Sequence, residues 1–158
     1  MPDLITHALG PYFAARYTWK TDRASMVVFI LGTMLPDLVS RPPNYALIRW
    51  FPLVNDLTGP LHSPFMAVLY CLVVSYLFAE PMRRKAYILL LAGSWVHLAL
   101  DALQIHVGSG YYMLFPLSRW KHVQGLIWPE DSLFIVPVLL VCWLGLLIVQ
   151  KTRKATRQ

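Results

Sequence analysis

Long apolar runs separated by short polar stretches dominate the chain and predict helices. About 20 apolar residues in a helix cross the hydrocarbon core of a bilayer. Runs of this kind lie at Leu4–Tyr17, Ala24–Leu35, Phe65–Ala79, Ala86–Gln104 and Ser132–Gln150. The first two are short, so they need tilt or packing inside a bundle to cross. The pattern predicts an all-α, polytopic membrane protein, a small bundle of about five helices that forms one domain over residues 1–158.

The stretches between these runs predict breaks and loops. Gly10-Pro11 is expected to interrupt the first helix. Leu38–Leu61 contains four prolines and is expected to be an irregular segment at the membrane interface, because irregular backbone cannot face lipid. The second loop, His106–Asp131, is rich in tyrosine and tryptophan, as in an aromatic belt at headgroup level.

Basic residues predict the orientation of the helices. The mean hydropathy of +0.51 indicates a membrane protein, and the net charge of +6 raises the alternative of a nucleic-acid partner. We exclude that partner, because ten of the 14 basic residues fall on one side of the predicted bundle. They are Arg16, Lys20, Arg23, Arg83, Arg84, Lys85, Lys151, Arg153, Lys154 and Arg157. The positive-inside rule places that side in the cytoplasm and the protein in the inner (cytoplasmic) membrane.

Polar residues within the fourth apolar run are the first candidates for chemistry. His97 and Asp101 are four residues apart, so they share one face of a helix. Gly93 lies one turn earlier, where a neighbouring helix could approach closely. A carboxylate within a membrane costs about 2.5–3.5 kcal/mol and therefore normally has a partner. The pair fits either a divalent metal ligand set or a hydrogen bond that only orders helix packing.

The predicted topology brings further histidines and a second aspartate to the same outer side. All five histidines fall there, which predicts a metal centre recessed below the outer headgroups. The predicted ligands are His7, Asp37, His62, His97 and Asp101. Taken singly, His7 and His62 also fit interfacial residues, and Asp37 fits a helix cap. His106 and His122 fit loop residues or headgroup contacts better than metal ligands, and Arg119 and Lys121 fit phosphate binding or lipid anchoring equally well.

Several short segments resemble the YdjM-like family of membrane-bound metal-dependent hydrolases. They are Thr6-His7-Ala8, Leu31-Gly-Thr-Met-Leu-Pro-Asp37, Leu61-His62-Ser63, His97-Leu-Ala-Leu-Asp101 and Trp128-Pro129. That family is in turn similar to zinc-dependent phospholipase C. The resemblance implies that Asp37, His62, His97 and Asp101 hold one metal, and that His7 shares Asp101 to help hold a second. The family often has Pro-Asp-Ile-Asp-His, whereas Leu38, Val39 and Ser40 follow Asp37 here.

The residues and the resemblance together predict a function. We expect a membrane-bound metal-dependent hydrolase that cleaves an ester, above all a phosphoester, of a lipid or lipid-linked substrate at the outer interface. The metal would be zinc, with manganese as the alternative. Asp37 or Asp101 would act as base or bridging ligand. The alternative is a non-catalytic membrane protein in which a His/Asp cluster binds metal structurally or locks the bundle.

Overall fold

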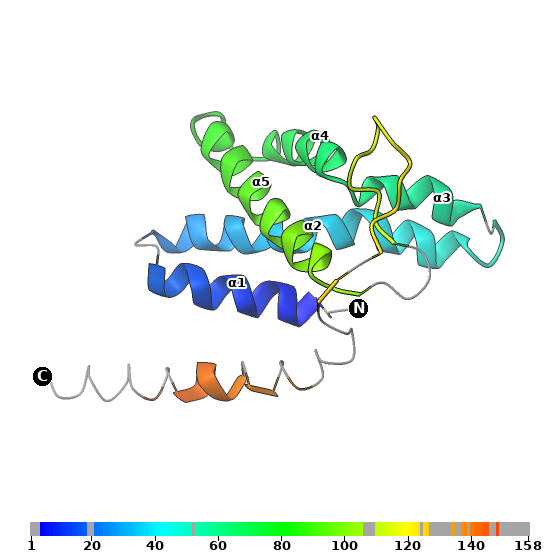
Figure 1. Cartoon of the computed structure of the whole chain (residues 1–158). Coiled ribbons are helices and arrows are strands. Elements are labelled where there is room, and N and C mark those ends of the chain that lie inside the picture. Colours follow the sequence, from blue (N-terminus) through cyan, green and yellow to red (C-terminus); the bar gives the residue numbers. More distant parts are fainter. Residues whose placement is uncertain are drawn as a thin grey trace, which may run out of the picture.

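The computed structural model describes residues 4–18, 21–51, 53–105, 110–123, 125–126, 134, 137–138, 140–145 and 148. The elements among these residues are all helices, and they contain no strand (Figure 1). In order they are α1 (Leu4–Thr18), α2 (Arg23–Leu47), α3 (Val54–Thr58), the 3-10 helix η1 (Gly59–Leu61), α4 (Pro64–Ser75) and α5 (Glu80–Ala102). The all-α prediction is confirmed for this part of the chain. The predicted last span, Ser132–Gln150, lies largely outside the described residues.

Helices α2 and α5 cross in close contact at two glycines (Figure 1). A Cβ atom added to Gly32 would lie 2.4 Å from the carbonyl oxygen of Leu90. One added to Gly93 would lie 2.3 Å from the carbonyl oxygen of Phe29. No side chain fits at either position, so the backbones of the two helices touch. The expectation of a close helix contact at Gly93 is confirmed.

Pro36 lies at the centre of this contact, and α5 compensates for the donor that proline lacks. Without an N–H on Pro36, the carbonyl of Gly32 loses its usual helical partner. Ser94 Oγ of α5 donates a hydrogen bond to that carbonyl at 3.0 Å. The next carbonyl, that of Thr33, accepts a hydrogen bond from His97 Nδ1 at 2.6 Å. The carbonyls near the proline therefore bond to α5, and α2 does not end at Pro36.

The predicted loop over Leu38–Leu61 is wrong in its first part, because α2 continues to Leu47. An ion pair between Arg41 Nε and Asp37 Oδ1 at 2.7 Å spans one turn of this extension. Ser40 Oγ also donates to the carbonyl of Pro36 at 2.8 Å. Proline has a φ angle that suits a helix, so Pro42 and Pro43 each remove one backbone donor without unwinding the extension. The rest of the predicted loop contains α3 and η1.

The predicted interruption of the first helix is also wrong. Helix α1 continues through Gly10 and Pro11 to Thr18. Pro11 removes only the hydrogen bond to the carbonyl of His7, and α1 packs against α2. Packing therefore maintains the helix where local preference alone favours a break.

Paired contacts show the directions of the helices. Lys85 Nζ lies 2.9 Å from Asp22 Oδ2, which joins the beginnings of α2 and α5. Farther along the same two helices, Thr33 meets His97, so α2 and α5 run in the same direction. Helix α4 runs back along α5, with Cys71 Sγ 3.3 Å from Ser94 Oγ. Arg23 at the beginning of α2 and the basic residues Arg83, Arg84 and Lys85 in the first turns of α5 thus lie at one end of the molecule.

Apolar side chains cover much of the outer surface of these helices. Leu72 and Val73 of α4 and Ile88 and Trp95 of α5 are all exposed. Large exposed apolar surfaces are typical of contact with lipid or a partner protein. Among the helices of the described residues, Arg23–Leu47 alone is long and apolar enough to cross a membrane by length and composition, and Pro64–Ser75 is apolar but shorter.

Candidate metal centre

Four of the five predicted ligands converge in the interior. Asp37 comes from α2, His62 directly follows η1, and His97 and Asp101 come from the last turns of α5. One potential ligand atom from each residue lies within 4.8 Å of every other, and all four side chains are buried. Nitrogen and carboxylate oxygen donors at this spacing are those that zinc takes. The cluster could hold a metal ion.

The contact of His97 with α2 shows which nitrogen of its ring carries a proton. A carbonyl oxygen can only accept a hydrogen bond, so Nδ1 carries the proton that it donates to Thr33. In a neutral ring this leaves a lone pair on Nε2. That atom lies 3.1 Å from Asp101 Oδ2 and 3.7 Å from Asp37 Oδ1, two further acceptors. A ring nitrogen bonded to a backbone carbonyl in this way is the usual support of a metal-binding histidine.

His62 contacts two groups through its two ring nitrogens. Its Nε2 makes a hydrogen bond with Asp101 Oδ2 at 2.6 Å, and because a carboxylate oxygen can only accept, Nε2 is the donor. Its Nδ1 lies 3.3 Å from Ser40 Oγ, whose hydroxyl donates to the carbonyl of Pro36. Of the two rings, only that of His97 therefore directs an acceptor atom at the carboxylates.

The Nε2 atom of His97 and the oxygens of Asp37, which have no hydrogen-bond partner among the described residues, test whether the residues fit a metal. Buried acceptors that face each other repel unless a cation lies between them. Protons on both rings would neutralise the two carboxylates, but His97 Nε2 has no aligned hydrogen bond to either carboxylate in the described structure. A divalent ion would satisfy both rings and both carboxylates at once. The donor set therefore fits a divalent metal.

His7, the fifth predicted ligand, lies on the opposite side of Asp101. Its Nε2 is 3.2 Å from Asp101 Oδ1, whereas His62 and His97 approach Oδ2. The His7 ring stacks on that of His97 with 3.9 Å between the ring centroids. His7 is 1% exposed, so the interpretation as an interfacial residue is wrong. It is nevertheless not a member of the four-residue group.

The remaining histidines differ from these five residues. His122 Nε2 donates to the carbonyl of Ala102 at 3.2 Å, and its backbone pairs with that of Tyr111. It therefore fastens the loop of residues 110–123 to the end of α5 and is not a member of the four-residue group. His106 lies outside the described residues.

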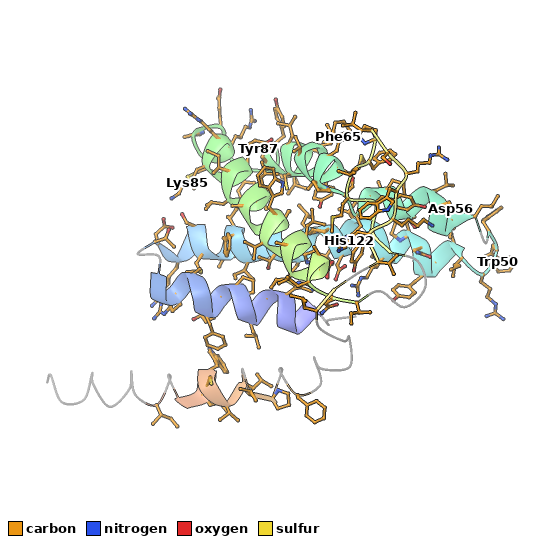
Figure 2. All side chains as sticks on the ribbon, viewed as in Figure 1. Trp50, Asp56, Phe65, Lys85, Tyr87 and His122 are labelled. Atoms are coloured by element: carbon orange, nitrogen blue, oxygen red, sulfur yellow. The ribbon has the colours of Figure 1, made fainter. Side chains whose placement is uncertain are left out.

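A polar cavity of about 110 Å³ opens above the cluster. Asp37 and His62 belong both to the cluster and to the cavity wall. The wall continues along α2 and is completed by the segment around Asp56 and by the loop that carries His122, both labelled in Figure 2. Its other polar residues are Ser40, Arg41, Asn44, Asp56, Thr58, Tyr111, Tyr112 and Lys121. A small molecule can therefore reach two of the four potential ligands.

Sequence reasoning missed the part of the site that the end of α2 carries. Asp37, Ser40, Arg41 and Asn44 have the spacing of one helix face, which is a detectable signal. The adjacent prolines hid it, because they favour a loop. The contribution of Thr33 is a backbone carbonyl, for which no sequence signal exists.

Comparison with known proteins adds a family and a cellular location. A family model described as YdjM inner membrane protein matches residues 1–157. No curated protein matches the chain. No solved structure matches it either. The family description gives a membrane and no activity, so the chemistry must be argued from the site.

Proposed function

This chain belongs to the YdjM inner membrane protein family, and we propose that it is a metal-dependent hydrolase that cleaves a phosphoester of a lipid or lipid-linked substrate. One observation carries the proposal. Two members of the buried group of Asp37, His62, His97 and Asp101, namely Asp37 and His62, also line an open cavity. A ligand set at the base of a cavity is the arrangement that a catalytic metal requires.

Access from the cavity favours a catalytic over a structural metal. Structural zinc is enclosed by four protein ligands, whereas catalytic zinc keeps a position for water or substrate. Asp37 and His62 line the cavity, so an incoming molecule would meet the metal position between them. Mixed imidazole and carboxylate ligands suit zinc best, and manganese is the alternative.

The chemistry follows from what each residue can do. A divalent ion held here would lower the pKa of water towards neutrality and polarise a phosphoryl oxygen. Asp37 lines the cavity and is the candidate general base, because its carboxylate can accept a proton there. Asp101 is fully buried and is contacted by three histidines, so we assign it the role of a ligand. His7, at the second oxygen of Asp101, is placed to hold a second and weaker ion.

We also propose that the protein crosses the inner membrane several times, with the site towards the outer side. The ion pair of Asp22 and Lys85 supports this, since it brings the basic residues at the beginnings of α2 and α5 to one end of the molecule. The positive-inside rule then makes that end cytoplasmic. A lipid-linked substrate would reach the cavity from the opposite leaflet.

Metal-dependent turnover by the purified protein tests the function. The protein is assayed in liposomes with a panel of lipid phosphoesters, and the metal content is measured on the same preparation. We expect hydrolysis that a chelator abolishes and that zinc or manganese restores. Asp37→Asn should lower turnover about 100-fold or more, because the amide keeps the size of the side chain and cannot accept the proton.

The outcome that opposes the proposal is equally specific. A protein that holds its metal tightly and hydrolyses none of the panel would support the non-catalytic alternative. In that case Asp37→Asn would reduce the unfolding temperature and leave no activity to lose.

A further inference from the structure

Arg41 is a basic residue of the cavity wall that has a buried hydrogen-bond donor without a partner among the described residues. Its Nε pairs with Asp37 Oδ1 at 2.7 Å. Its Nη2 atom is buried and has no hydrogen-bond partner within the described part of the chain. A buried guanidinium donor without a partner is costly and rare in folded proteins. Since Arg41 lines the cavity, an acceptor that enters the cavity can supply the missing partner.

The charges around the cavity indicate the kind of acceptor. Lys121 Nζ lies 3.7 Å from Asp56 Oδ1, so these two charges balance each other within the cavity wall. Within the four-residue cluster, the negative charges of Asp37 and Asp101 would balance a divalent ion, and the positive charge of Arg41 would remain. A phosphodiester carries one negative charge, whereas a phosphomonoester approaches two at neutral pH because its second pKa is about 6.

We propose that this cavity is a phosphate subsite in which Arg41 Nη2 binds a non-bridging oxygen of a phosphodiester. The proposal rests on the proposed function and names its substrate class. Guanidinium groups bind phosphate through directed, charge-assisted hydrogen bonds, and Asp37 holds this one in orientation. The cavity volume of about 110 Å³ is well below the roughly 300–1,000 Å³ of a site for a whole drug-sized ligand. It therefore accepts the phosphate and leaves larger substituents outside.

Anion binding by the zinc-loaded protein tests the subsite without relying on turnover. Isothermal titration calorimetry would compare dimethyl phosphate with methyl phosphate on the wild type and on Arg41→Gln, Arg41→Lys and Arg49→Gln. Arg49 is the matched control, since it is an exposed arginine that follows α2 and does not line the cavity. Zinc content is measured for every variant.

The expected result is a loss confined to Arg41. Arg41→Gln should bind dimethyl phosphate about tenfold or more weakly, in keeping with the loss of one hydrogen bond to a charged group. Arg49→Gln should match the wild type, and Arg41→Lys should lie between, because it keeps the charge without the planar fork. The wild type should prefer dimethyl phosphate to methyl phosphate.

A short-chain lipid separates two sources of the same phosphate chemistry. Dihexanoyl phosphatidylglycerol, used below its micelle concentration, should bind through Arg41 as well. Tighter binding than that of dimethyl phosphate indicates a lipid headgroup, and equal binding indicates that the free diester group is all that is recognised. Both results support the subsite.

Four results would overturn the proposal. The first three are unchanged affinity in Arg41→Gln, an equal loss in Arg49→Gln, and preference for the monoester. Loss of zinc from both Arg41 variants would also overturn it, because Arg41 would then act only through Asp37. A protein that binds the diester through Arg41 and hydrolyses nothing would refute the hydrolase and leave the subsite intact.

Discussion

Asp101 is the residue on which the centre depends most. His62 and His97 approach one of its carboxylate oxygens, and His7 approaches the other. Two supports outside the cluster, the carbonyl of Thr33 and the hydroxyl of Ser40, determine which ring nitrogens face it. Such supports orient ligands and raise their basicity, so they contribute to metal affinity without touching the metal.

Removal of one histidine ring from the cluster should remove the metal. We expect His97→Ala to lose most of the bound ion, since one ligand and its orienting hydrogen bond disappear together. His122→Ala is the control, because His122 contacts the carbonyl of Ala102 and not the cluster. Elemental analysis of both purified variants measures the effect. Equal metal content in His97→Ala and the wild type would make His97 a packing residue.

At the scale of elements, the contact of α2 with α5 positions the ligands. Glycines allow the two backbones to touch, and Ser94 and His97 bond to the carbonyls beside Pro36. The same proline that weakens α2 as an isolated helix thus creates acceptors for α5. The contact determines how far Asp37 lies from the ligands of α5.

A methyl group added at Gly93 should disturb the contact between α2 and α5. We expect Gly93→Ala to destabilise the protein by about 1–3 kcal/mol, because its Cβ would lie 2.3 Å from the carbonyl oxygen of Phe29. Gly10→Ala in α1 is the matched control, since nothing lies within 4 Å of its added Cβ. Alanine also favours the helix there, so this control should be neutral or stabilising. Denaturant unfolding in detergent compares the two, and equal stabilities would contradict the close contact.

The opposite end of the same helix pair predicts a dependence on pH. Two hydrogen bonds from Ser25 and the ion pair with Lys85 hold the pKa of the Asp22 carboxyl below its ordinary range. A lowered pKa stabilises the folded state above the pKa of the unfolded chain, about 3.9, and this stabilisation is lost as pH falls through the folded pKa. Asp22→Asn should therefore lower the unfolding temperature at pH 6, and the difference should shrink in acid. A constant difference would show that the charge contributes nothing.

At the scale of the whole molecule, the basic residues that begin α2 and α5 lie at one end and the candidate site lies at the other. The ion pair between Asp22 and Lys85 holds the basic residues at the beginnings of α2 and α5 together at one end, and the cavity lies towards the other end of these helices. Between these two ends, exposed apolar side chains cover the outer surfaces of α4 and α5. This arrangement suits a bundle with a site near one membrane surface.

Labelling of single cysteines tests that arrangement in cells. In a background with Cys71 and Cys142 replaced by serine, Trp50→Cys should react with a membrane-impermeant maleimide added from outside, and Arg84→Cys should not. Both positions are exposed, so a difference between them reports the side of the membrane. The reverse pattern would place the site in the cytoplasm.

What the sequence by itself determined are the features that depend on residue type and local spacing. Apolar runs showed where α1, α4 and α5 lie, and the four-residue spacing of His97 and Asp101 placed both on one helix face. The order of short polar segments indicated the family that the comparison shows. These features are readable because they depend on neighbours in the chain.

The tertiary structure alone decided the shape of the site. The local preference of the prolines around Arg41 predicts a loop. Hydrogen bonds from α5 and the ion pair between Arg41 and Asp37 nevertheless keep α2 helical. The continued helix brings Arg41 to the cavity beside the cluster. The rings of His62 and His97 are held by Ser40 and by a backbone carbonyl that any residue at position 33 would supply. These contacts join segments far apart in the sequence, and their energies exceed local preference only once the helices have packed.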